Sequence, residues 1–417
     1  MSIMVYIDPG TGSMLFTLAL GVVSVLWFGL KGIFMKLKYL NPRNDKQSSN
    51  TIPFVIFSDD KRYWKYFEPI CRELDQRGFD TVYMTESEDD PVFQCGLPHV
   101  EGRYIGSGNK AYGKLNFLNA VMVLSTTHGL DVYQWKKSKD VQQYIYIPHC
   151  ANAMTSMKMF SLDFYDTILV SGQYQIDLTR KLEALRNEPP KEIVLVGIPY
   201  MDEILERLEK AAPPEKNGVT VLLAPSWGKS SVLKRFGGEF IQKLLETGYH
   251  IIIRPHPQSF VSETEMIEQL MHDYPESEQI EWNRDVDNFD VLHRSDILIS
   301  DYSGTVFEFA LAYDKPVICV DTDFDDSQYD TCWLDETPWS IAALPKLGKI
   351  LKEEDIPDIK NIIDICLTDE HYSQMRQQLS EEAWAFKKQG TVRVADYLMS
   401  RYQQLTGQEE KRNEVEA

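Results

Sequence analysis

The chain has few of the residues and motifs that define several protein classes. It contains six cysteines in 417 residues, none in a CxxC pair or in a cysteine–histidine pattern with zinc spacing. Disulfide frameworks are typical of small secreted domains, so we expect these cysteines to be reduced and mostly buried. The GxxxxGKS/T motif is also absent, which argues against a P-loop ATPase. No acidic run has the spacing of a metal-binding loop, and we expect neither a metal nor a cofactor.

Positive charge is scarce as well. Lysine and arginine total 43 against 63 aspartates and glutamates, which gives a net charge of −20. A protein this acidic repels a phosphate polyanion, so we expect no nucleic-acid partner, although a local basic pocket for one nucleotide is compatible with this charge. Hydrophobic residues make up 43% of the chain, an ordinary globular value that excludes wholesale disorder.

Charged residues are missing from positions 9–30, and the run over 14–28 is strongly apolar. With the apolar residues just beyond, this segment reaches the ~20 residues that cross a hydrocarbon core. A cleaved signal peptide needs positive charge before its apolar run, but here Asp8 precedes the run and four basic residues follow it over 31–43. The positive-inside rule then places the rest of the chain in the cytoplasm. We predict one transmembrane helix within residues 9–34, anchoring the chain in the cell membrane; a buried soluble helix is the alternative.

After a polar linker over 41–50, short apolar runs alternate with helical patterns. Strands are predicted over 53–58, 81–84, 121–125, 143–147, 167–171 and 192–196, with helices over 66–77 and 174–185. A second series follows the Ala-Ala-Pro-Pro breaker at 211–214, with strands predicted over 219–224, 250–254, 296–300 and 316–320. The end of the chain, 369–405, is predicted to be helical. Continuous apolar strands alternating with helices predict parallel sheets covered on both faces.

This pattern predicts an α/β fold with two doubly wound, Rossmann-like domains that face a cleft. The predicted units are an anchor and linker over 1–50, a first domain over 51–210, a second domain over 211–405 and a charged tail over 406–417. In open α/β sheets, ligands bind at the carboxyl ends of the strands. The residues directly after the predicted strands are therefore the candidates for a functional site.

The first candidate site lies where the strand over 296–300 runs into an alanine-rich helix. Asp301, Ser303, Gly304 and Thr305 place capping groups, hydroxyls and free backbone N–H groups at the helix N-terminus. The positive end of the helix dipole makes this a ready site for a phosphate. Simple N-capping by Asp301 or Ser303 is the structural alternative.

Two further strand ends of the second domain carry polar residues. Arg254 and His256 follow the strand over 250–254, and the prolines on either side of His256 present its imidazole with little backbone freedom. Next to a phosphate, His256 could donate a hydrogen bond or carry positive charge. Ser226 and Lys229 follow the strand over 219–224 and could contact a phosphate or form a simple turn.

In the first domain, His149 follows the strand over 143–147 and faces His256 across the predicted cleft. A neutral histidine there could take a proton from an acceptor hydroxyl. His128 also follows a predicted strand and competes for this role. The Gly106-Ser107-Gly108 sequence resembles a dinucleotide fingerprint, but no clear strand is predicted before it, so we do not interpret it as a cofactor site.

Taken in order, these segments resemble the CDP-glycerol glycerophosphotransferase family, the teichoic-acid primases and polymerases. The matching pieces lie within about residues 120–400 and are His149, 197–202, 224–227, 254–257, 300–303 and Lys315-Pro316. The resemblance implies a GT-B fold, with the acceptor on the first domain and the nucleotide donor on the second. It also implies transfer of glycerol phosphate from CDP-glycerol to a hydroxyl of a membrane-borne, for example lipid-linked, acceptor, with release of CMP.

Carried over residue by residue, the resemblance implies that His149 is the general base and that His256 acts on the donor pyrophosphate. Ser303, Gly304 and Thr305 would form the phosphate cradle, and Glu308 would contact the ribose. The donor-binding set is then Ser226, Arg254, Asp301, Ser303, Gly304, Thr305 and Glu308.

The chain departs from the family pattern at two places. The family has Trp-His-Gly-Thr-Pro-Leu-Lys around the base, whereas Pro148 and Cys150 flank His149 here; Gly304 replaces a serine, which keeps the N–H and loses a hydroxyl. Two other functions therefore stay open: a GT-B glycosyltransferase that uses a nucleotide sugar, and a non-catalytic anchored scaffold. Identifying the released nucleotide distinguishes a glycosyltransferase from a glycerophosphotransferase, and failure to bind CDP would indicate a scaffold.

Overall fold

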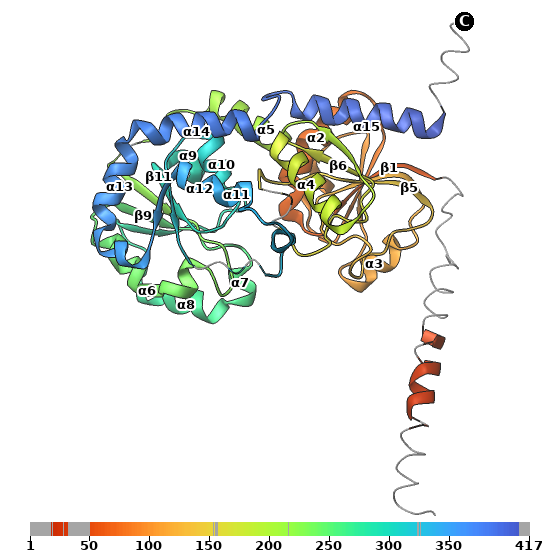
Figure 1. The fold of residues 1–417 in the computed structure, drawn as a ribbon, viewed down its shortest axis with the longest axis horizontal. Coiled ribbons are helices and arrows are strands. Elements are labelled where there is room, and N and C mark those ends of the chain that lie inside the picture. Colours follow the sequence, from red (N-terminus) through yellow and green to blue (C-terminus); the bar gives the residue numbers. More distant parts are fainter. Residues whose placement is uncertain are drawn as a thin grey trace, which may run out of the picture. The chain divides into compact units, whose positions relative to one another are not determined.

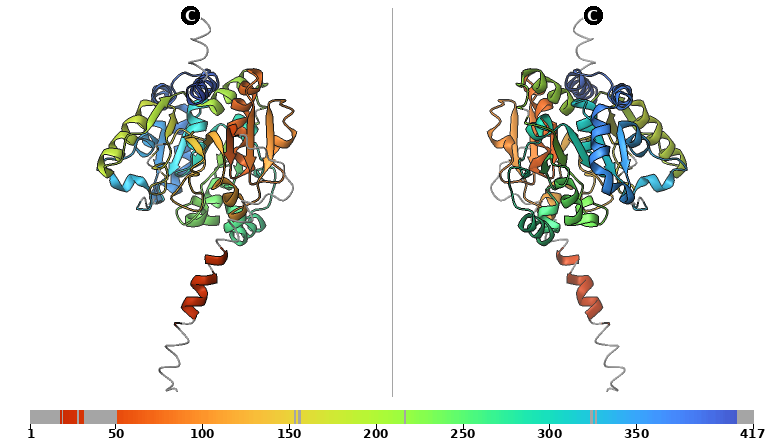
Figure 2. Two further views of the ribbon diagram at one scale, coloured as in Figure 1. Left: turned by 90° about the vertical axis from the view of Figure 1, so that its right-hand side faces the viewer. Right: turned by 90° about the vertical axis from the view of Figure 1, so that its left-hand side faces the viewer.

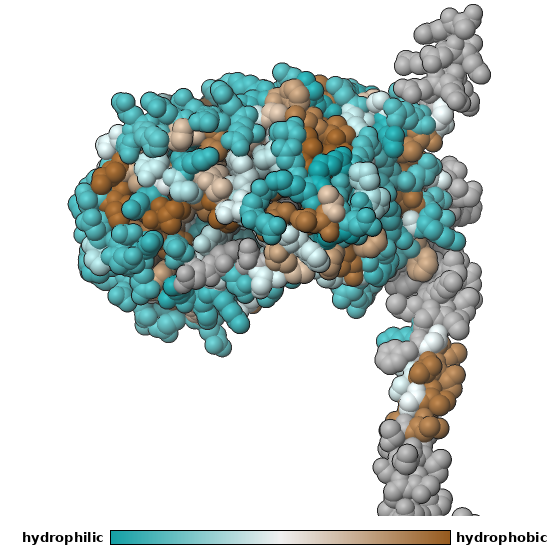
Figure 3. Space-filling model, in the orientation of Figure 1, coloured by the Kyte–Doolittle hydropathy of each residue, from teal (hydrophilic) through white to brown (hydrophobic). Residues whose placement is uncertain are grey.

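The computed structural model describes residues 18, 20–27, 29–31, 51–152, 154, 157–215, 217–322, 325 and 327–407. The chain divides into two units, Met1–Thr51 and Ile52–Ala417. The predicted anchor over 9–34 lies partly outside the described residues; the residues described there are helical, with exposed and mostly hydrophobic side chains (Figure 3). None of the helices in the described part of the chain combines the length and the apolar character needed to cross a bilayer.

The first half of the second unit forms a seven-stranded, wholly parallel sheet with the order β3-β2-β1-β4-β5-β6-β7. Its strands are β1 (Ile52–Ser58), β2 (Thr81–Thr85), β3 (Val100–Tyr104), β4 (Ala120–Ser125), β5 (Val141–Tyr146), β6 (Thr167–Val170) and β7 (Glu192–Leu195). Its helices are η1 (Lys61–Tyr63), α2 (Trp64–Gln76), η2 (Pro91–Gln94), α3 (Asn109–Leu115), α4 (Gln173–Arg186) and α5 (Pro199–Lys210). The strand order reverses between β1 and β4, which places a ligand crevice at their carboxyl ends.

The second half forms a six-stranded parallel sheet with the order β10-β9-β8-β11-β12-β13. Its strands are β8 (Thr220–Leu223), β9 (His250–Ile253), β10 (Ile280–Trp282), β11 (Ile297–Ser300), β12 (Val317–Val320) and β13 (Gly348–Leu351). The helices up to β13 are α6 (Val232–Leu245), α7 (Ser259–Ser262), α8 (Thr264–Asp273), α9 (Phe289–Arg294), α10 (Thr305–Ala312), η3 (Asp330–Trp333), α11 (Trp339–Ala342) and α12 (Leu344–Leu347). After β13 follow η4 (Glu353–Asp358), α13 (Ile359–Thr368), α14 (Glu370–Ala383) and α15 (Gly390–Thr406).

Both sheets are buried on both faces. Every residue of β4, β11 and β12 is buried, as their continuous apolar sequences require for strands in the middle of a covered parallel sheet. Each sheet has a hydrophobic cluster on either side, and helices cover the two faces (Figures 1 and 2). The prediction of two doubly wound α/β domains is thereby confirmed. The six cysteines are free, and Cys71, Cys319 and Cys366 are buried.

The C-terminal helices connect the two domains. Helix α14 packs beside α10 of the second domain, whereas α15 packs beside α2 on the first sheet (Figure 1). The turn between them is held by the buried carboxylate of Asp202, which accepts hydrogen bonds from Lys388 N at 2.6 Å, Gly390 N at 2.7 Å and Trp384 Nε1 at 3.2 Å. Burial raises the pKa of Asp202 to about 6. The 197–202 segment therefore has a structural role: through Asp202 it holds the turn between α14 and α15 in place.

The strands that the sequence did not predict are β3, β10 and β13. Each lies at an edge of its sheet and is short or polar, because an edge strand need not be apolar on both faces. Strand β3 runs directly into the Gly106-Ser107-Gly108 turn and then into α3, so the interpretation that no strand precedes this turn is wrong. The turn lies away from the β1/β4 reversal, and the Gly108 N–H donates to Glu86 Oε2 at 2.6 Å.

Candidate active site

The carboxyl ends of the two sheets meet at the N-terminus of α10. A methyl group added to Gly304 would lie 3.4 Å from Cβ and 3.5 Å from Sγ of Cys150, in ordinary van der Waals contact. The loop after β5, which carries His149, therefore touches the helix that was predicted to bind phosphate. Cys150 and Gly304, which both depart from the family pattern, are neighbours in space. The cysteine side chain lies beside Gly304, which has no side chain of its own.

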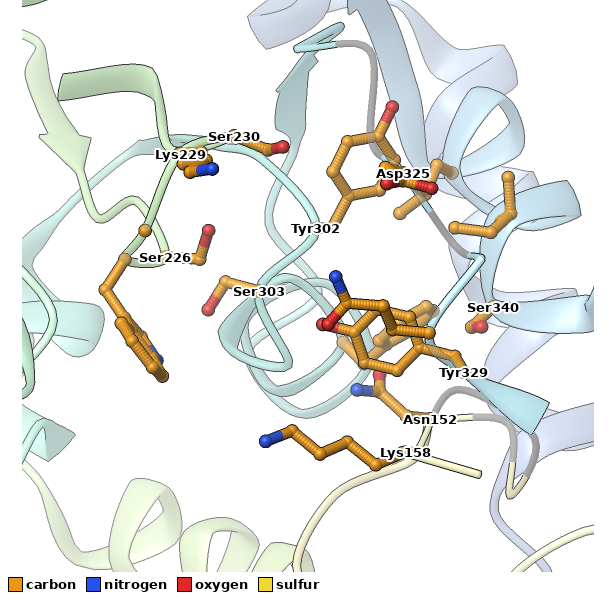
Figure 4. Close-up of a pocket in the computed structure, with 16 residues that line it drawn as sticks. Asn152, Lys158, Ser226, Lys229, Ser230, Tyr302, Ser303, Asp325, Tyr329 and Ser340 are labelled. Atoms are coloured by element: carbon orange, nitrogen blue, oxygen red, sulfur yellow. The ribbon is translucent and has the colours of Figure 1, made fainter. Parts of the chain in front are cut away.

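A cavity of about 520 Å³ opens at this junction. Asn152 and Lys158 line it from the first domain, and Ser226, Lys229 and Ser303 are among the residues that line it from the second (Figure 4). Its volume is in the range of cavities that hold a cofactor-sized or nucleotide-sized ligand.

The cavity is suited to an anion. Figure 4 shows Lys158 and Lys229 on opposite sides of the cavity, with the hydroxyls of Ser226 and Ser303 between them. Among the lining residues that the structure describes, the single carboxylate belongs to Asp325, and it accepts a hydrogen bond from Ser327 N at 3.0 Å. Two ammonium groups and several hydroxyls facing one carboxylate favour a phosphate ligand.

The N-terminus of α10, residues 303–305, is called its mouth here, and it has backbone N–H groups that donate no hydrogen bond within the described chain. The Ser303 Oγ accepts a long 3.4 Å hydrogen bond from Thr305 N, so it caps the helix weakly. Within the described chain, the backbone N–H groups of Ser303 and Gly304 have no acceptor. Such unsatisfied N–H groups at the positive end of a helix dipole form an anion site.

Asp301 organises this site without reaching the cavity. Its buried carboxylate accepts hydrogen bonds from Ser226 N at 2.8 Å and from Val232 N at 3.1 Å. Burial raises the pKa of this carboxyl group. Asp301 thus fixes the loop between β8 and α6, and with it the position of Ser226.

His256 is held in one tautomer. Its Nδ1 accepts a hydrogen bond from Gln258 N at 3.1 Å, so a neutral ring carries its proton on Nε2. Burial, with Arg62 nearby, lowers the pKa of His256 to about 4, and the ring is neutral at pH 7. Its centroid lies 6.4 Å from the ring of Trp227, which lines the cavity. His256 is therefore a hydrogen-bond donor beside the cavity, and not a cation.

Arg254 and Glu308 do not line the cavity. The Arg254 guanidinium donates to Asn283 Oδ1 and, at 2.7 Å, to the carbonyl oxygen of Asp285. The buried Glu308 carboxylate accepts hydrogen bonds from Asn288 Nδ2 at 3.0 Å and Tyr66 Oη at 3.4 Å. Both side chains therefore have partners inside the protein.

Glu308 belongs to a polar network between the domains. Lys65, on α2, donates to Tyr200 Oη and to Asn288 Oδ1, both at 3.1 Å. Burial lowers the pKa of Lys65, and the Glu308 carboxylate opposes this shift. The network joins α2 and α5 of the first domain to α9 and α10 of the second.

His149 lies in the first-domain wall of the junction, outside the main cavity. Its Nδ1 is 3.0 Å from Thr126 Oγ1, and its ring contacts Tyr63 and Tyr66 at centroid distances of 5.2 and 5.5 Å. Burial and nearby cations lower its pKa to about 3, so the ring is neutral at pH 7. The His128 ring lies 6.2 Å away.

The sequence did not predict Asn152, Lys158 or Tyr329 as site residues. They lie in loops with no motif, and Lys158 and Tyr329 meet because they pair across the domain junction. Asp325, also not predicted, is exposed and forms part of the cavity wall.

The sequence matches a known family over most of its length. Residues 48–394 match the family model described as CDP-Glycerol:Poly(glycerophosphate) glycerophosphotransferase. The chain belongs to this family. The teichoic acid glycerol-phosphate primase of Bacillus spizizenii is a relative, 27% identical over 169 residues, which are 37% of this chain and 39% of the primase. The aligned part thus spans about two fifths of that curated relative.

Solved structures with the same fold include a teichoic acid polymerase. The wall teichoic acid polymerase TagF is 16% identical in sequence and superposes with a TM-score of 0.58, covering 93% of this chain and 98% of TagF. UDP-GlcNAc 2-epimerase from Neisseria meningitidis superposes with a TM-score of 0.56 at 13% identity, covering 83% of this chain and 99% of the epimerase. These likenesses show a GT-B-like fold for this family member.

Proposed function

We propose that the chain transfers glycerol phosphate from CDP-glycerol to a hydroxyl of a poly(glycerophosphate)-type acceptor, releasing CMP. The observation that carries this proposal is the cavity at the mouth of α10, lined by Lys158, Lys229, Ser226 and Ser303, in a chain that matches the glycerophosphotransferase family over residues 48–394. The acidic remainder of the protein offers little attraction to a phosphate elsewhere.

In this reaction the acceptor hydroxyl attacks the β-phosphorus of the donor. His149, neutral and set in the first-domain wall, takes the hydroxyl proton as the new P–O bond forms. The bond from the β-phosphorus to the bridging oxygen breaks, and CMP leaves with that electron pair. The N–H groups of Ser303 and Gly304 and the Nε2–H of His256 stabilise the negative charge on the phosphates.

A screen of activated donors tests the proposed function directly. The full chain in detergent is supplied with an acceptor and with CDP-glycerol, CDP-ribitol, UDP-sugars or GDP-sugars in parallel, and the released nucleotide is identified. Release of CMP from CDP-glycerol is the expected result. Release of UDP or GDP would indicate a glycosyltransferase, and no release from any donor, with no heat on CDP titration, would indicate a scaffold.

The pH dependence of the reaction follows from the two neutral histidines. Because the pKa of His256 is lowered to about 4 and that of His149 to about 3, both rings keep their neutral forms well below the ordinary histidine value. We expect kcat/KM for CDP-glycerol to stay level from about pH 8 down to about pH 5, because protonation of either histidine, and the fall in rate that it causes, occurs only at lower pH. A fall in kcat/KM centred near the ordinary histidine pKa of about 6.5 would contradict this expectation.

We also propose that residues 9–34 anchor the chain in the cell membrane, with the soluble domains on its cytoplasmic side. The apolar run and the basic residues after it support this, as do exposed side chains such as Val23 and Leu26. Full-length protein is expected in the membrane fraction after a carbonate wash. The double substitution Val23→Lys, Leu26→Lys should release it, because a central charge costs about 3 kcal/mol; Val23→Leu, Leu26→Val is the matched control. Release of the unmodified chain by carbonate would refute the anchor.

A further inference from the structure

Two loops, one from each domain, are joined beside the cavity. The first-domain loop comprises residues 157–163, between β5 and β6. The second-domain strap comprises residues 327–334, after β12. Lys158 and Tyr329 form an antiparallel bridge between the loop and the strap, and backbone hydrogen bonds of 2.9 and 3.3 Å join their neighbours. The backbone of Lys158 is thereby fixed to the cavity wall of the opposite domain.

A buried charge cluster holds the strap in place. Arg186, on α4, donates to Asp330 at 2.8 Å and also pairs with Asp163. The three side chains are 6%, 2% and 8% exposed, in that order. Asp330 also accepts a hydrogen bond from Phe160 N at 3.0 Å. Loss of Arg186 would leave two buried carboxylates without their shared partner. Loss of Asp330 would remove the contacts that join the strap to Arg186 and to Phe160 N, so the cluster is a firm attachment point.

The side chain of Lys158 is directed by this attachment. It lines the cavity, and Figure 4 shows its ammonium group pointing into the space that Ser226 and Ser303 also face. Within the described chain it has no ion-pair partner, whereas Lys137 and Lys181 of the same domain are paired with carboxylates. An unpaired ammonium group held at the wall of an anion cavity is placed to bind a ligand's negative charge.

We propose that Lys158 binds the diphosphate of the nucleotide donor from the first domain, and that Asp330, through the strap, positions it. This inference rests on the proposed function, since it concerns the same donor. The ligand class is a nucleoside diphosphate, held on one side by the α10 mouth and Lys229 and on the other by Lys158. The donor would thus contact both domains, and its phosphates would be neutralised from opposite sides.

Calorimetric titration of CDP into the full chain in detergent tests this assignment. Lys158→Met is expected to weaken CDP binding about tenfold, since it removes one charge-assisted contact to phosphate, while Lys158→Arg retains most of the affinity. Lys139→Met removes an exposed lysine of the same domain outside the cavity and is the matched control. Cytidine, which has no phosphate, should bind the Lys158→Met and unmodified proteins alike. CDP binding that is unchanged in Lys158→Met would overturn the proposal.

The positioning role of Asp330 is tested by a double-mutant cycle. Asp330→Asn is expected to weaken CDP binding by roughly threefold or more in the presence of Lys158, but to have little further effect in the Lys158→Met background, because the strap acts through that lysine. Equal effects in the two backgrounds would overturn the positioning role. Should Asp330→Asn prevent folding, as thermal melting would show, the Lys158 variants alone decide the proposal.

The same titrations separate this inference from the proposed function. If the unmodified chain binds UDP in preference to CDP, the donor assignment fails, and the Lys158 comparison is made with UDP instead. A tenfold loss in Lys158→Met would then support the diphosphate contact on a different donor. If Lys158→Met and the unmodified chain bind CDP equally well, and UDP equally well, the contact between Lys158 and the diphosphate is refuted, whichever donor the chain uses.

Discussion

Replacing His256 by alanine is expected to lower kcat for glycerol phosphate transfer by about 10²–10³-fold and leave the protein folded. This is the usual cost of removing one preorganised donor that stabilises charge in a transition state. The Nδ1 of His256 is occupied by Gln258 N, so the ring offers its Nε2–H, and its neutral state makes this donor available at pH 7. The initial rate of CMP release at saturating CDP-glycerol measures the effect.

Two variants separate catalysis from folding in this experiment. His256→Gln keeps a side-chain N–H donor and should recover part of the rate. His250, at the amino end of β9, the strand whose carboxyl end leads to His256, is the matched control, and His250→Ala should keep the full rate. Full turnover by His256→Ala, with a normal melting temperature, would remove His256 from the mechanism.

The second large effect is expected from the first-domain histidines. His149→Ala should lower kcat by about 10²–10⁴-fold, the range for loss of a general base, whereas His128→Ala should lower it less than about tenfold. His149 contacts Thr126 and lies in the loop that touches the α10 mouth, while His128 Nε2 is 3.0 Å from Tyr146 Oη and faces the core of the first domain. Single-turnover rates with saturating acceptor distinguish the two residues.

The order of these two effects decides the assignment of the base. If His128→Ala is the slow variant and His149→Ala is close to the unmodified protein, the roles are reversed. If neither variant is slow, proton transfer does not depend on a first-domain histidine. Circular dichroism melting curves of both variants confirm that any loss of rate is not a loss of fold.

The central strands were predictable because burial on both faces demands continuous apolar sequence. The strands over 143–147 and 296–300 were found in this way; the end of the first located His149, and the end of the second located the α10 mouth. Three of the four edge strands, β3, β10 and β13, were missed because the exposed side of an edge strand tolerates polar residues, as in the VEGRY sequence of β3. The consequence was a mistaken interpretation of the Gly106-Ser107-Gly108 turn.

The candidate site was predictable only where its residues are close in sequence. The Ser303, Gly304 and Thr305 pattern encodes a helix N-terminus locally, so its phosphate-binding role could be proposed from the sequence. Lys158 approaches the cavity through a bridge to Tyr329, 171 residues away along the chain, and no local pattern encodes that contact. The same holds for Glu308, whose partners Tyr66 and Asn288 come from other elements.

A crystal structure of the full-length protein soaked with CDP tests the donor site most directly. We expect the diphosphate to lie at the mouth of α10, within hydrogen-bond distance of the Ser303 and Gly304 N–H groups, with the His256 Nε2 directed at it. A diphosphate bound elsewhere, or a mouth of α10 that stays empty at saturating CDP, would refute this site.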